Sequence, residues 1–312
     1  MRIFVVDGFI LIHTLLYSRI VFKRVSAVRI KRLINNNMVV AVVDDEDVIV
    51  LGRGIGFAKK AGDVVPSSNV EQIYRMQDPE HIKYLQKLIS DASLEDVRLA
   101  IKLATYVKSN YSRPVNETLL IVIMDHVGAA KLRHSKRLDL VNPMLYDIKN
   151  IYPEEYEIGL HLLSIIEEDT GMHLLDDEAG FLALNIVNAQ TGQDMGKVMD
   201  VTTFVRRVLD VVRAHFSISV SPDSPYFSRF LTHLKYLAVR ILDGTRPVNG
   251  VISQILNIQG GTDQYEDIQD AINDISNLTE TYYGHKLDND ERMYLLVHLV
   301  TLLKAGEQGI LQ

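Results

Sequence analysis

Two different patterns of hydrophobic and polar positions divide the chain. Near the front, short runs of β-branched residues lie between clusters of Asn, Asp and Gly, which is the pattern of strands joined by tight turns. Farther along, apolar residues recur three and four positions apart, as in YLQKLISDASLEDVRLAIKLATYV, and Pro79 marks the change. The sequence therefore predicts a small all-β domain followed by a long all-α region.

The β domain is predicted to span residues 29–77 as a four-stranded antiparallel sheet. Its strands are expected near residues 29–34, 38–43, 47–52 and 70–74. The Asn triplet at 35–37 predicts a hairpin turn, because Asn tolerates left-handed backbone and bonds locally through its amide. The segment GRGIG at 52–56 predicts a second tight turn. It has neither the Gly-Lys-Ser/Thr ending of a phosphate loop nor the spacing of a dinucleotide fingerprint.

An internal repeat organises the helical region. MDHV at 124–127 recurs as LTHL at 231–234, and DDEAGFLALNIVNAQ at 176–190 recurs as DNDERMYLLVHLVTL at 288–302. Such self-similarity predicts repeated structural units. We therefore expect two all-α helical bundles, and their predicted bounds are 78–190 and 191–305, followed by a tail at 306–312.

The first 28 residues are apolar but have no clear period. A secretory signal is disfavoured because no small-residue cleavage site is evident. A membrane span is disfavoured because Asp7, His13 and Arg19 interrupt the apolar run. The interpretation we favour is a start codon assigned too early, with translation beginning near Val28, so that residues 1–28 form an N-terminal extension.

The charge distribution indicates that a polyanion such as a nucleic acid could bind only near the front of the chain, because the remainder is acidic. The net charge is −7, but residues 1–77 carry 11 Lys/Arg against 7 Asp/Glu, while the remainder carries 22 against 33. Within 29–77 the balance is only 7 against 6, so recognition of a nucleic acid there would depend on shape and sequence. The chain has no Cys, which excludes a disulfide framework and a cysteine zinc site and suits a reducing cytosol.

The two predicted turns contain side chains that can read RNA. Each motif alone would be only a turn, but turns joined by a short hairpin can share one edge of a sheet. That edge would gather Asn35, Asn37, Arg53 and Phe57, with Arg32 nearby. An Asn amide can bond a base edge, Arg presents a planar fork, and Phe offers a stacking face. Such a surface suits an irregular or partly unpaired hairpin, since regular A-form helix hides its base edges.

Three histidines fall at repeated positions on otherwise apolar helices, namely His126, His233 and His298. A single histidine on an apolar helix would usually be interpreted as a core residue whose ring nitrogens are hydrogen-bonded within the protein. A metal site has no His-Glu-x-x-His spacing to support it, and a catalytic triad has no serine motif. The repetition favours a shared role. No cofactor motif or convergent carboxylate pair indicates an enzyme.

RIKRLINNN followed by VLGRGIGFAKKAGD resembles the co-antiterminator RNA-binding domain of the BglG/SacY family of transcriptional antiterminators. The two helical repeats resemble the phosphotransferase-system (PTS) regulation domains that follow it in that family, and the resemblance covers Arg29 to about Leu303. It implies a small β dimer that clamps a hairpin in leader mRNA. The RNA-binding residues that it implies are Arg32, Asn35, Asn37, Gly52, Arg53 and Phe57.

The resemblance also gives the repeated histidines a role as phosphoacceptors. The family has two such histidines in each regulation domain, and here they are His126, His233 and His298. Asn185 stands where the first domain should have its second histidine, and Asn cannot accept a phosphoryl group. The expected neighbours that orient the rings are Asp125, Glu178 and Glu291.

The implied function is that of a cytoplasmic transcriptional antiterminator, which is not an enzyme and needs no cofactor, metal or membrane insertion. A homodimer would bind the leader mRNA hairpin and prevent a terminator from forming in a sugar-utilisation operon. In the family, a sugar-specific PTS permease (enzyme II) phosphorylates the first domain and switches the protein off, while the phosphocarrier protein HPr phosphorylates the second and stabilises the active dimer. A PTS-regulated DNA-binding activator is the alternative, disfavoured because the front offers strands and no recognition helix. A sugar-processing enzyme is weaker still.

Overall fold

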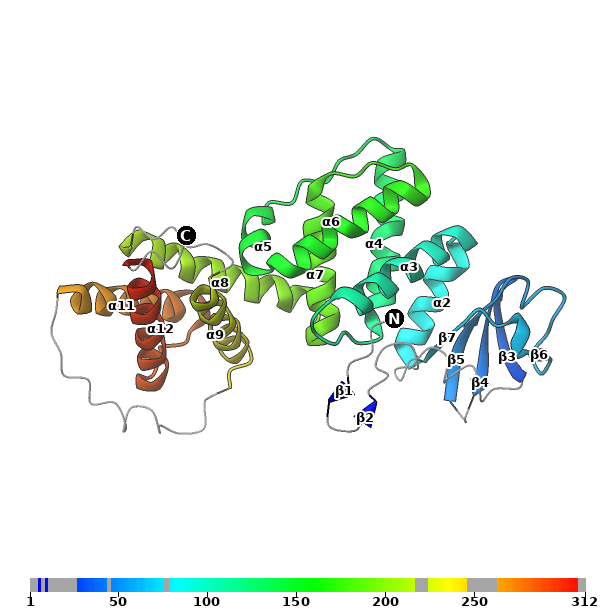
Figure 1. Ribbon diagram of the computed structural model, residues 1–312, viewed down its shortest axis with the longest axis horizontal. Helices are drawn as coiled ribbons and strands as arrows, with labels where there is room; N and C mark the ends of the chain where they lie inside the picture. Colours follow the sequence, from blue (N-terminus) through cyan, green and yellow to red (C-terminus); the bar gives the residue numbers. More distant parts are fainter. Residues whose placement is uncertain are drawn as a thin grey trace. The chain divides into compact units, whose positions relative to one another are not determined.

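The computed structural model describes residues 5–6, 9–10, 27–43, 46–75, 79–216, 224–245 and 263–307. The chain forms two compact units (Figure 1). The first comprises residues 1–105 with 116–132, and the second comprises residues 106–115 with 133–312. Our prediction for residues 1–28 lies almost wholly outside the described residues. Only β1 (Val5–Val6), its antiparallel partner β2 (Phe9–Ile10) and the start of the third strand are described there.

A five-stranded antiparallel sheet with the order β6-β3-β4-β5-β7 forms the front of the first unit. Its strands are β3 (Ala27–Asn35), β4 (Met38–Val43), β5 (Glu46–Leu51), β6 (Val64–Pro66) and β7 (Gln72–Arg75). The four strands predicted from the sequence are present. The prediction of four strands in all was wrong by one, because β6 is only three residues long and ends in Pro, which leaves too little alternation to recognise.

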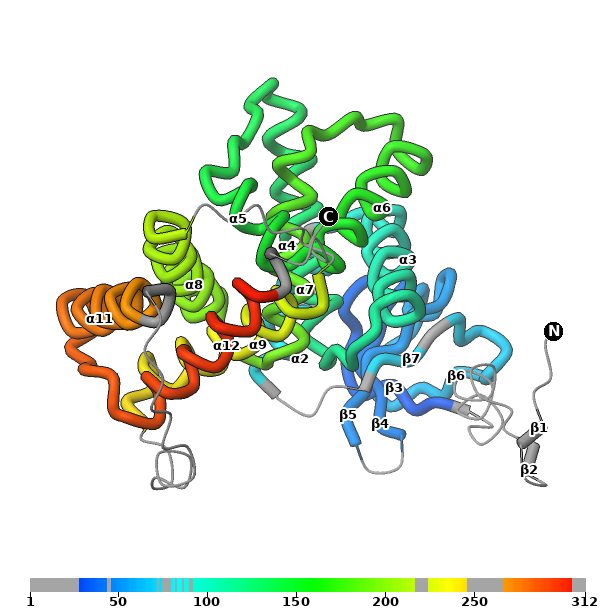
Figure 2. Tube along the Cα trace, turned by 60° about the vertical axis from the view of Figure 1, so that its left-hand side comes forward, coloured from blue at the N-terminus to red at the C-terminus, as the bar shows by residue number. Residues whose placement is uncertain are grey.

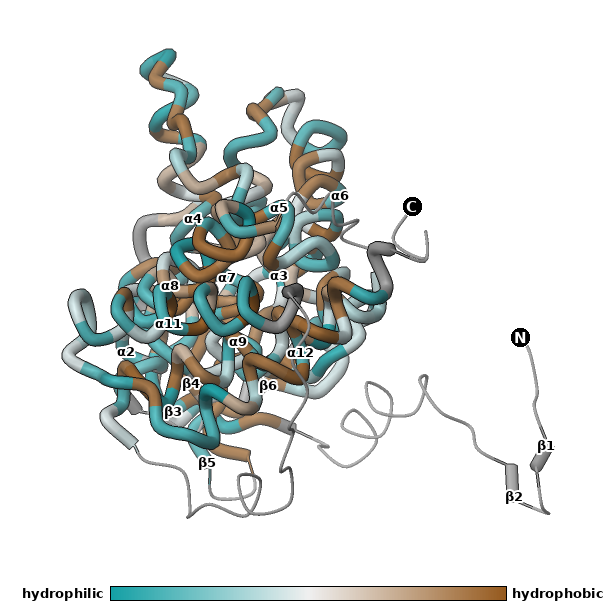
Figure 3. Tube along the Cα trace, turned by 90° about the vertical axis from the view of Figure 1, so that its left-hand side faces the viewer, coloured by the Kyte–Doolittle hydropathy of each residue, from teal (hydrophilic) through white to brown (hydrophobic). Residues whose placement is uncertain are grey.

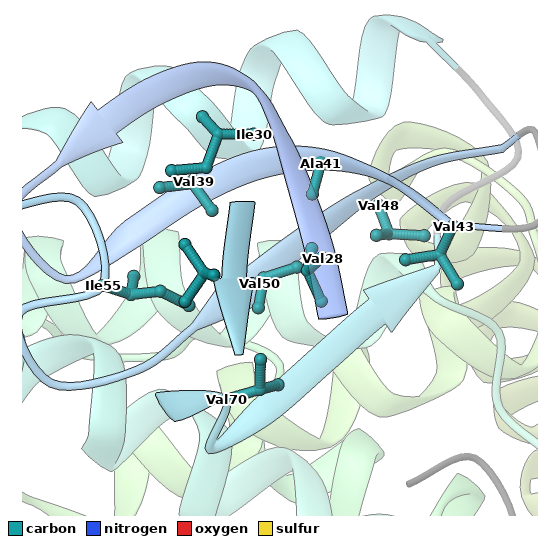
Figure 4. Packing of buried hydrophobic residues seen from close by; sticks show 10 residues of the cluster. Val28, Ile30, Val39, Ala41, Val43, Val48, Val50, Ile55 and Val70 are labelled. Atoms are coloured by element: carbon teal, nitrogen blue, oxygen red, sulfur yellow. The ribbon is translucent and has the colours of Figure 1, made fainter. Parts of the chain in front are cut away.

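One face of the sheet is buried, and the other face is buried in part. One face carries Val28, Ile30, Val39, Ala41, Val43, Val48 and Val50, and Ile55 and Val70 pack with them (Figure 4). Because successive residues of a strand point to opposite faces, Met38, Val40 and Ile49 belong to the other face, and they too are buried. Helix α2 (Pro79–Asp91) packs near β3. This double burial explains why the strands read as nearly continuous apolar runs.

The helical region begins at Pro79, one residue after the predicted boundary. Pro is well suited to the first turn of a helix, where its missing N–H costs nothing. Helices α3 (Leu94–Asn110) and α4 (Thr118–Ser135) follow α2. Ser93 caps α3 reciprocally: its Oγ accepts from the Asp96 N–H, and the Asp96 carboxylate accepts from the Ser93 N–H and hydroxyl.

The second unit consists of packed helices along which hydrophobic and hydrophilic positions alternate (Figure 3). Most of its buried residues are hydrophobic. They are α5 (Leu145–Ile151), α6 (Pro153–Thr170), α7 (Asp176–Thr191), α8 (Met195–His215), α9 (Pro225–Leu242), α11 (Asp263–Tyr283) and α12 (Asn289–Glu307). Helix α6 packs closely on α7, and α9 packs on α8 and α12 (Figure 2). In the described residues, no helix is long and apolar enough to cross a membrane.

Candidate RNA-binding and phosphorylation sites

The structure brings the two predicted turns together at one end of the sheet. The N–H of Gly52 donates to the carbonyl of Asn37 at 3.0 Å, and the N–H of Gly56 donates to the carbonyl of Asn36 at 3.0 Å. A side chain joins the turns as well, because Asn37 Oδ1 accepts from the N–H of Gly54 at 2.8 Å. The turns therefore form one continuous edge, as the arrangement for RNA reading requires.

The amides of the Asn triplet are partly used to build this edge. Asn35 Oδ1 accepts a hydrogen bond from the N–H of Asn37 at 2.8 Å, and Asn37 Oδ1 accepts one from the N–H of Gly54. The acceptor ends of both amides thus hold the turn. The donor end of Asn35 points toward the carbonyl of Ile89, 3.5 Å away at the C-terminal end of α2. The amide N–H groups of Asn37, and the second N–H of Asn35, are the groups that remain to meet a base edge.

Glycine is required in the second turn by the chain itself. A Cβ on Gly56 would lie 2.4 Å from the carbonyl oxygen of Asn35, and a Cβ on Gly52 would lie 1.9 Å from that of Asn69. The close neighbours of both glycines are therefore the protein's own carbonyls. Gly52 is buried, whereas Arg32, Arg53 and Phe57 are exposed, and Phe57 is 68% exposed.

Glu71 ties the edge to the helical region, and no motif in the sequence indicates this link. Its carboxylate accepts from the backbone N–H of Arg53 at 3.1 Å. The same carboxylate accepts from the guanidinium of Arg98, on α3, at 3.1 and 3.2 Å. A single acidic residue beside a predicted strand carries no recognisable pattern, so only the structure reveals this link.

The second repeat brings His233 and His298 into contact. His233 lies on α9 and His298 on α12, and their ring centroids are 4.1 Å apart with 35° between the planes. Tyr294, also on α12, places its hydroxyl against Nδ1 of His233. All three side chains are half-buried. Tyr294 was not among the residues singled out from the sequence, although it stands one helical turn before His298.

Burial keeps these two imidazoles neutral near pH 7. It lowers the pKa of His233, and it lowers the pKa of His298 to about 4, with further lowering by the charges of His233 and Arg229. Burial also raises the pKa of Tyr294, which therefore stays protonated. A neutral imidazole has a nitrogen lone pair, which a phosphoacceptor needs.

Glu178 and Glu291 occupy equivalent places in the two repeats. Glu178 binds Arg133 at 2.7 and 3.0 Å, and Glu291 binds Arg240 at 3.4 Å. Each arginine stands seven residues after a repeated histidine. Glu291 also accepts from the Asp288 N–H at 3.0 Å and contacts Nε2 of His285 at 2.9 Å. These contacts hold the first turn of α7 through Glu178 and the first turn of α12 through Glu291. The role expected from the sequence, that these acids orient the histidine rings, stays a prediction.

The first repeat places its expected residues on two helices. His126 is half-buried on α4, and its neighbour Asp125 is exposed and lies 3.4 Å from the hydroxyl of Tyr84 on α2. Asn185 lies on α7 and is 8% exposed. Asn185 thus occupies a buried position in a helix that also carries Glu178.

A polar junction joins α9 to α5 and α6 within the second unit. Lys235 Nζ donates to the carbonyl of Ile151 at 2.7 Å and lies 4.2 Å from the centre of the Tyr152 ring. Nearby, the buried carboxylate of Glu155 accepts from Tyr111 at 2.5 Å and from Arg113 at 3.3 Å. Burial lowers the pKa of Lys235 to about 8, against the opposing effect of Glu155. The helix that carries His233 is therefore anchored in the first repeat.

Comparison with known proteins identifies both regions. Residues 28–83 match the CAT RNA binding domain, and residues 101–189 and 206–302 each match the PRD domain. Transcription antiterminator LicT of Bacillus subtilis is 30% identical over 280 residues, which cover 89% of this chain and 100% of LicT. The beta-glucoside operon antiterminator of Dickeya chrysanthemi is 31% identical over 273 residues, covering 87% and 95%. The crystal structure of GlcT CAT-PRDI covers 53% of this chain and 99% of its own at 29% identity and a TM-score of 0.47.

Proposed function

The chain belongs to the BglG/SacY family of transcription antiterminators, and from this premise we propose that it binds a leader-RNA hairpin and prevents a terminator from forming in a sugar-utilisation operon. The observation that carries the proposal is the order of the matches, a CAT RNA-binding domain followed by two PRD domains. Members of this family act as RNA-binding regulators. The β domain binds the RNA, and the helical repeats control that binding.

RNA is read at the edge formed by the two turns. Arg53 and Phe57 are exposed there, and Asn37, whose amide oxygen holds the turn, lies beside them with its amide N–H groups available. Phe57 is 68% exposed, so the face of its ring is open to a partner. An unpaired base supplies that cover by stacking, and Arg53 adds a planar fork for a base edge or a phosphate. Arg32 extends the surface along β3.

The two repeats receive phosphoryl groups from the PTS. HPr phosphorylates the second repeat at His233 and His298, and a sugar-specific permease (enzyme II) phosphorylates the first at His126. A phosphoryl group adds nearly two negative charges and three acceptor oxygens, enough to repack a helix interface. Because Asn185 cannot be phosphorylated, negative control by the permease passes through His126 alone.

The active species is a homodimer that acts in the cytoplasm, where leader RNA is made. One edge of the kind described here offers few base contacts, and two copies related by symmetry would clamp both strands of a hairpin. A concentration series of the chain with a single RNA hairpin, followed by sedimentation, gives the stoichiometry. Two chains per hairpin are expected, and one chain per hairpin would contradict the dimer.

A gel shift separates RNA binding from the alternative, a DNA-binding activator. The probes are the RNA transcribed from upstream of the gene and duplex DNA of the same sequence. We expect the RNA hairpin alone to shift, with Arg53→Ala weakening binding by about 1–3 kcal/mol. Lys31→Ala, on an exposed lysine of the same domain, controls for the loss of one charge. A shift of the duplex DNA without a shift of the RNA would support the activator.

A further inference from the structure

Glu71 lies beside the edge that the two turns form. Its N–H donates to the carbonyl of Leu51 at 2.8 Å, just before the turn that begins at Gly52. Its carboxylate reaches the same turn and accepts from the N–H of Arg53 at 3.1 Å. The main chain and the side chain of this one residue therefore both hold the turn that presents Arg53.

A carboxylate at this place is unfavourable for RNA binding. Every phosphate of RNA is negatively charged, and a protein binds RNA partly through the positive charges that it presents. Residues 29–77 carry 7 Lys/Arg against 6 Asp/Glu, and Glu71 is one of these acids. Without a partner, its charge would offset that of Arg53. The turn therefore needs a cation that compensates Glu71.

Arg98 supplies that cation from outside the sheet. Its Nη2 donates to both carboxylate oxygens of Glu71, at 3.1 and 3.2 Å. The two side chains are 47% and 42% exposed, so water screens the pair and it contributes little to the stability of the fold. Its effect is local, because a compensated carboxylate that is bonded to the Arg53 N–H holds the turn without repelling a phosphate.

The helix that presents Arg98 is itself held in place. Arg98 lies on α3, and Ser93 caps the first turn of this helix. Two residues before Arg98, the carboxylate of Asp96 binds Lys131 on α4, the helix that also carries His126. A side chain on a rigid element can hold its partner in one place. The contact of Arg98 with Glu71 thus connects the helical region to the RNA-binding edge.

We propose that Arg98 is a positioning residue of the RNA-binding site, which acts through Glu71: it compensates the Glu71 carboxylate and keeps it on the N–H of Arg53, so that the turn presents Arg53 to RNA. The inference rests on the proposed function, because it requires this edge to bind RNA. Arg98 itself does not touch the RNA. Its loss leaves an uncompensated carboxylate beside the RNA, and the effect of that loss disappears when residue 71 carries no charge.

A double-mutant cycle on RNA affinity tests the inference with the full chain. Fluorescence titration with the leader hairpin compares the wild type, Arg98→Ala, Glu71→Gln and the double variant. Arg98→Ala should weaken binding about two- to fivefold, the effect expected for loss of an exposed ion pair. Glu71→Gln should bind at least as tightly as the wild type, because its amide oxygen can still accept from the Arg53 N–H. When Glu71→Gln is already present, Arg98→Ala should change nothing.

An ion pair at the other end of β5 provides the matched control cycle. Lys31 Nζ lies 2.7 Å from the Asp47 carboxylate, and the side chains are 56% and 37% exposed. Asp47 stands near the start of β5, whereas the turn follows the end of this strand at Leu51. The effect of Lys31→Ala should be the same with Asp47 as with Asp47→Asn. Equal coupling in the two cycles would overturn the inference, because it would show a general effect of charge.

The cycle separates failure of the inference from failure of the proposed function. An equal loss of affinity from Arg98→Ala with Glu71 and with Glu71→Gln would show that Arg98 contacts the RNA directly. No loss in either case would show that Arg98 has no role in binding. Both results sink the inference alone, whereas a wild type that does not bind the hairpin sinks the proposed function with it. Thermal unfolding midpoints close to that of the wild type confirm that the variants are folded.

The backbone amide signal of Arg53 gives a readout that needs no RNA. In ¹H–¹⁵N correlation spectra, an amide proton moves upfield when its hydrogen bond weakens. Arg98→Ala should move the Arg53 signal in this direction, because the Glu71 carboxylate is then no longer held on the N–H. Lys31→Ala should leave the signal where it is. An unchanged Arg53 signal in Arg98→Ala would contradict the positioning role.

Discussion

The glycines of the turn at 52–56 show how single residues decide the RNA-reading edge. Gly54 has a φ of 66°, a conformation that residues with a Cβ rarely adopt. Gly56 approaches the Asn35 carbonyl so closely that no side chain fits between them. The turn that presents Arg53 and Phe57 therefore depends on residues that need not touch RNA themselves.

Replacing Gly56 by Ala should damage both stability and RNA binding. The added Cβ would lie 2.4 Å from the Asn35 oxygen, so one of the two turns has to move. We expect the free energy of unfolding to fall by about 1–3 kcal/mol and RNA affinity to fall with it. Gly128→Ala, where nothing lies within 4 Å of the new Cβ, is the control for chemical denaturation. Equal stability of the two variants would contradict this account of the turn.

Replacing Phe57 by Ala should affect RNA binding alone. The ring is 68% exposed, so its removal leaves the fold intact, but a stacked base would lose about 1–3 kcal/mol of binding free energy. Val64, 48% exposed in the same domain, gives the control variant Val64→Ala. Fluorescence titration with the leader hairpin measures the effect, and unaltered affinity of Phe57→Ala would exclude this ring from the interface.

Side chains whose types suit RNA binding could be selected from the sequence, and their role stays a prediction, whereas the residues that support them could not be selected. Asn35, Arg53 and Phe57 stand out because their types suit base edges and stacking. Glu71 and Tyr294 contact neighbours that are distant in sequence, and a lone acid or a tyrosine in an apolar helix has no pattern of its own. Contacts across 18 and 61 positions require the fold to be known.

Among the helices, α9 connects the two repeats. It carries His233 on the side that meets α12 and Lys235, two residues later, on the side that meets α5. Positions two apart on a helix do not share a face, so one element can contact both repeats. A change at His233 that moves α9 would also move the contact of Lys235 with Ile151.

The pH dependence of stability reports on this junction. Burial lowers the pKa of Lys235 to about 8 in the folded state, against the ordinary value of 10.5. Between these values the unfolded chain binds more protons, so the contribution of Lys235 to stability rises with pH across that window. Below pH 8 the buried ammonium opposes folding.

Lys235→Met should therefore remove one component of the pH dependence. We expect the unfolding free energy of the wild type, minus that of the variant, to increase as pH rises from about 7.5 to about 10. Lys304→Met, on an exposed lysine of α12, controls for the loss of a charge. A difference that falls or stays level across this range would show that the surroundings of Lys235 do not lower its pKa.

Element prediction succeeded where periodicity was long and failed where it was short. The helices α7 and α12 could be paired as repeats because seven residues separate an acid from Asn185 in one and from His298 in the other. Strand β6 escaped notice because three residues cannot show an alternation. The anchoring of α9 by Lys235 was equally hidden, since a lysine beside an apolar stripe usually faces solvent.

At the scale of the whole molecule, the two repeats differ in how many of the expected histidines they carry. The second has a pair of histidines in contact, and the first has His126 with Asn185 at the position of the second histidine. The domain bounds predicted from the sequence, 29–77, 78–190 and 191–305, remain predictions, as does the homodimer. This difference between the repeats leads to a specific prediction about how the inducing sugar controls the protein.

Inducer control should depend on His126 alone. In cells that carry a readthrough reporter behind the leader, His126→Ala should give full readthrough with or without the inducing sugar, because no phosphoacceptor remains in the first repeat. Asn185→His should instead deepen repression in the absence of sugar by restoring a second acceptor. A full response of His126→Ala to inducer would contradict this scheme.

The central claim is that the β domain binds leader RNA and thereby allows transcription to pass a terminator. Transcription in a purified system tests it most directly, with a template that carries the DNA upstream of the gene and the terminator within it. We predict that the wild-type protein raises the fraction of full-length transcript and that Phe57→Ala, at the same concentration, does not. An unchanged fraction with the wild type, or the same rise with Phe57→Ala, would contradict the account.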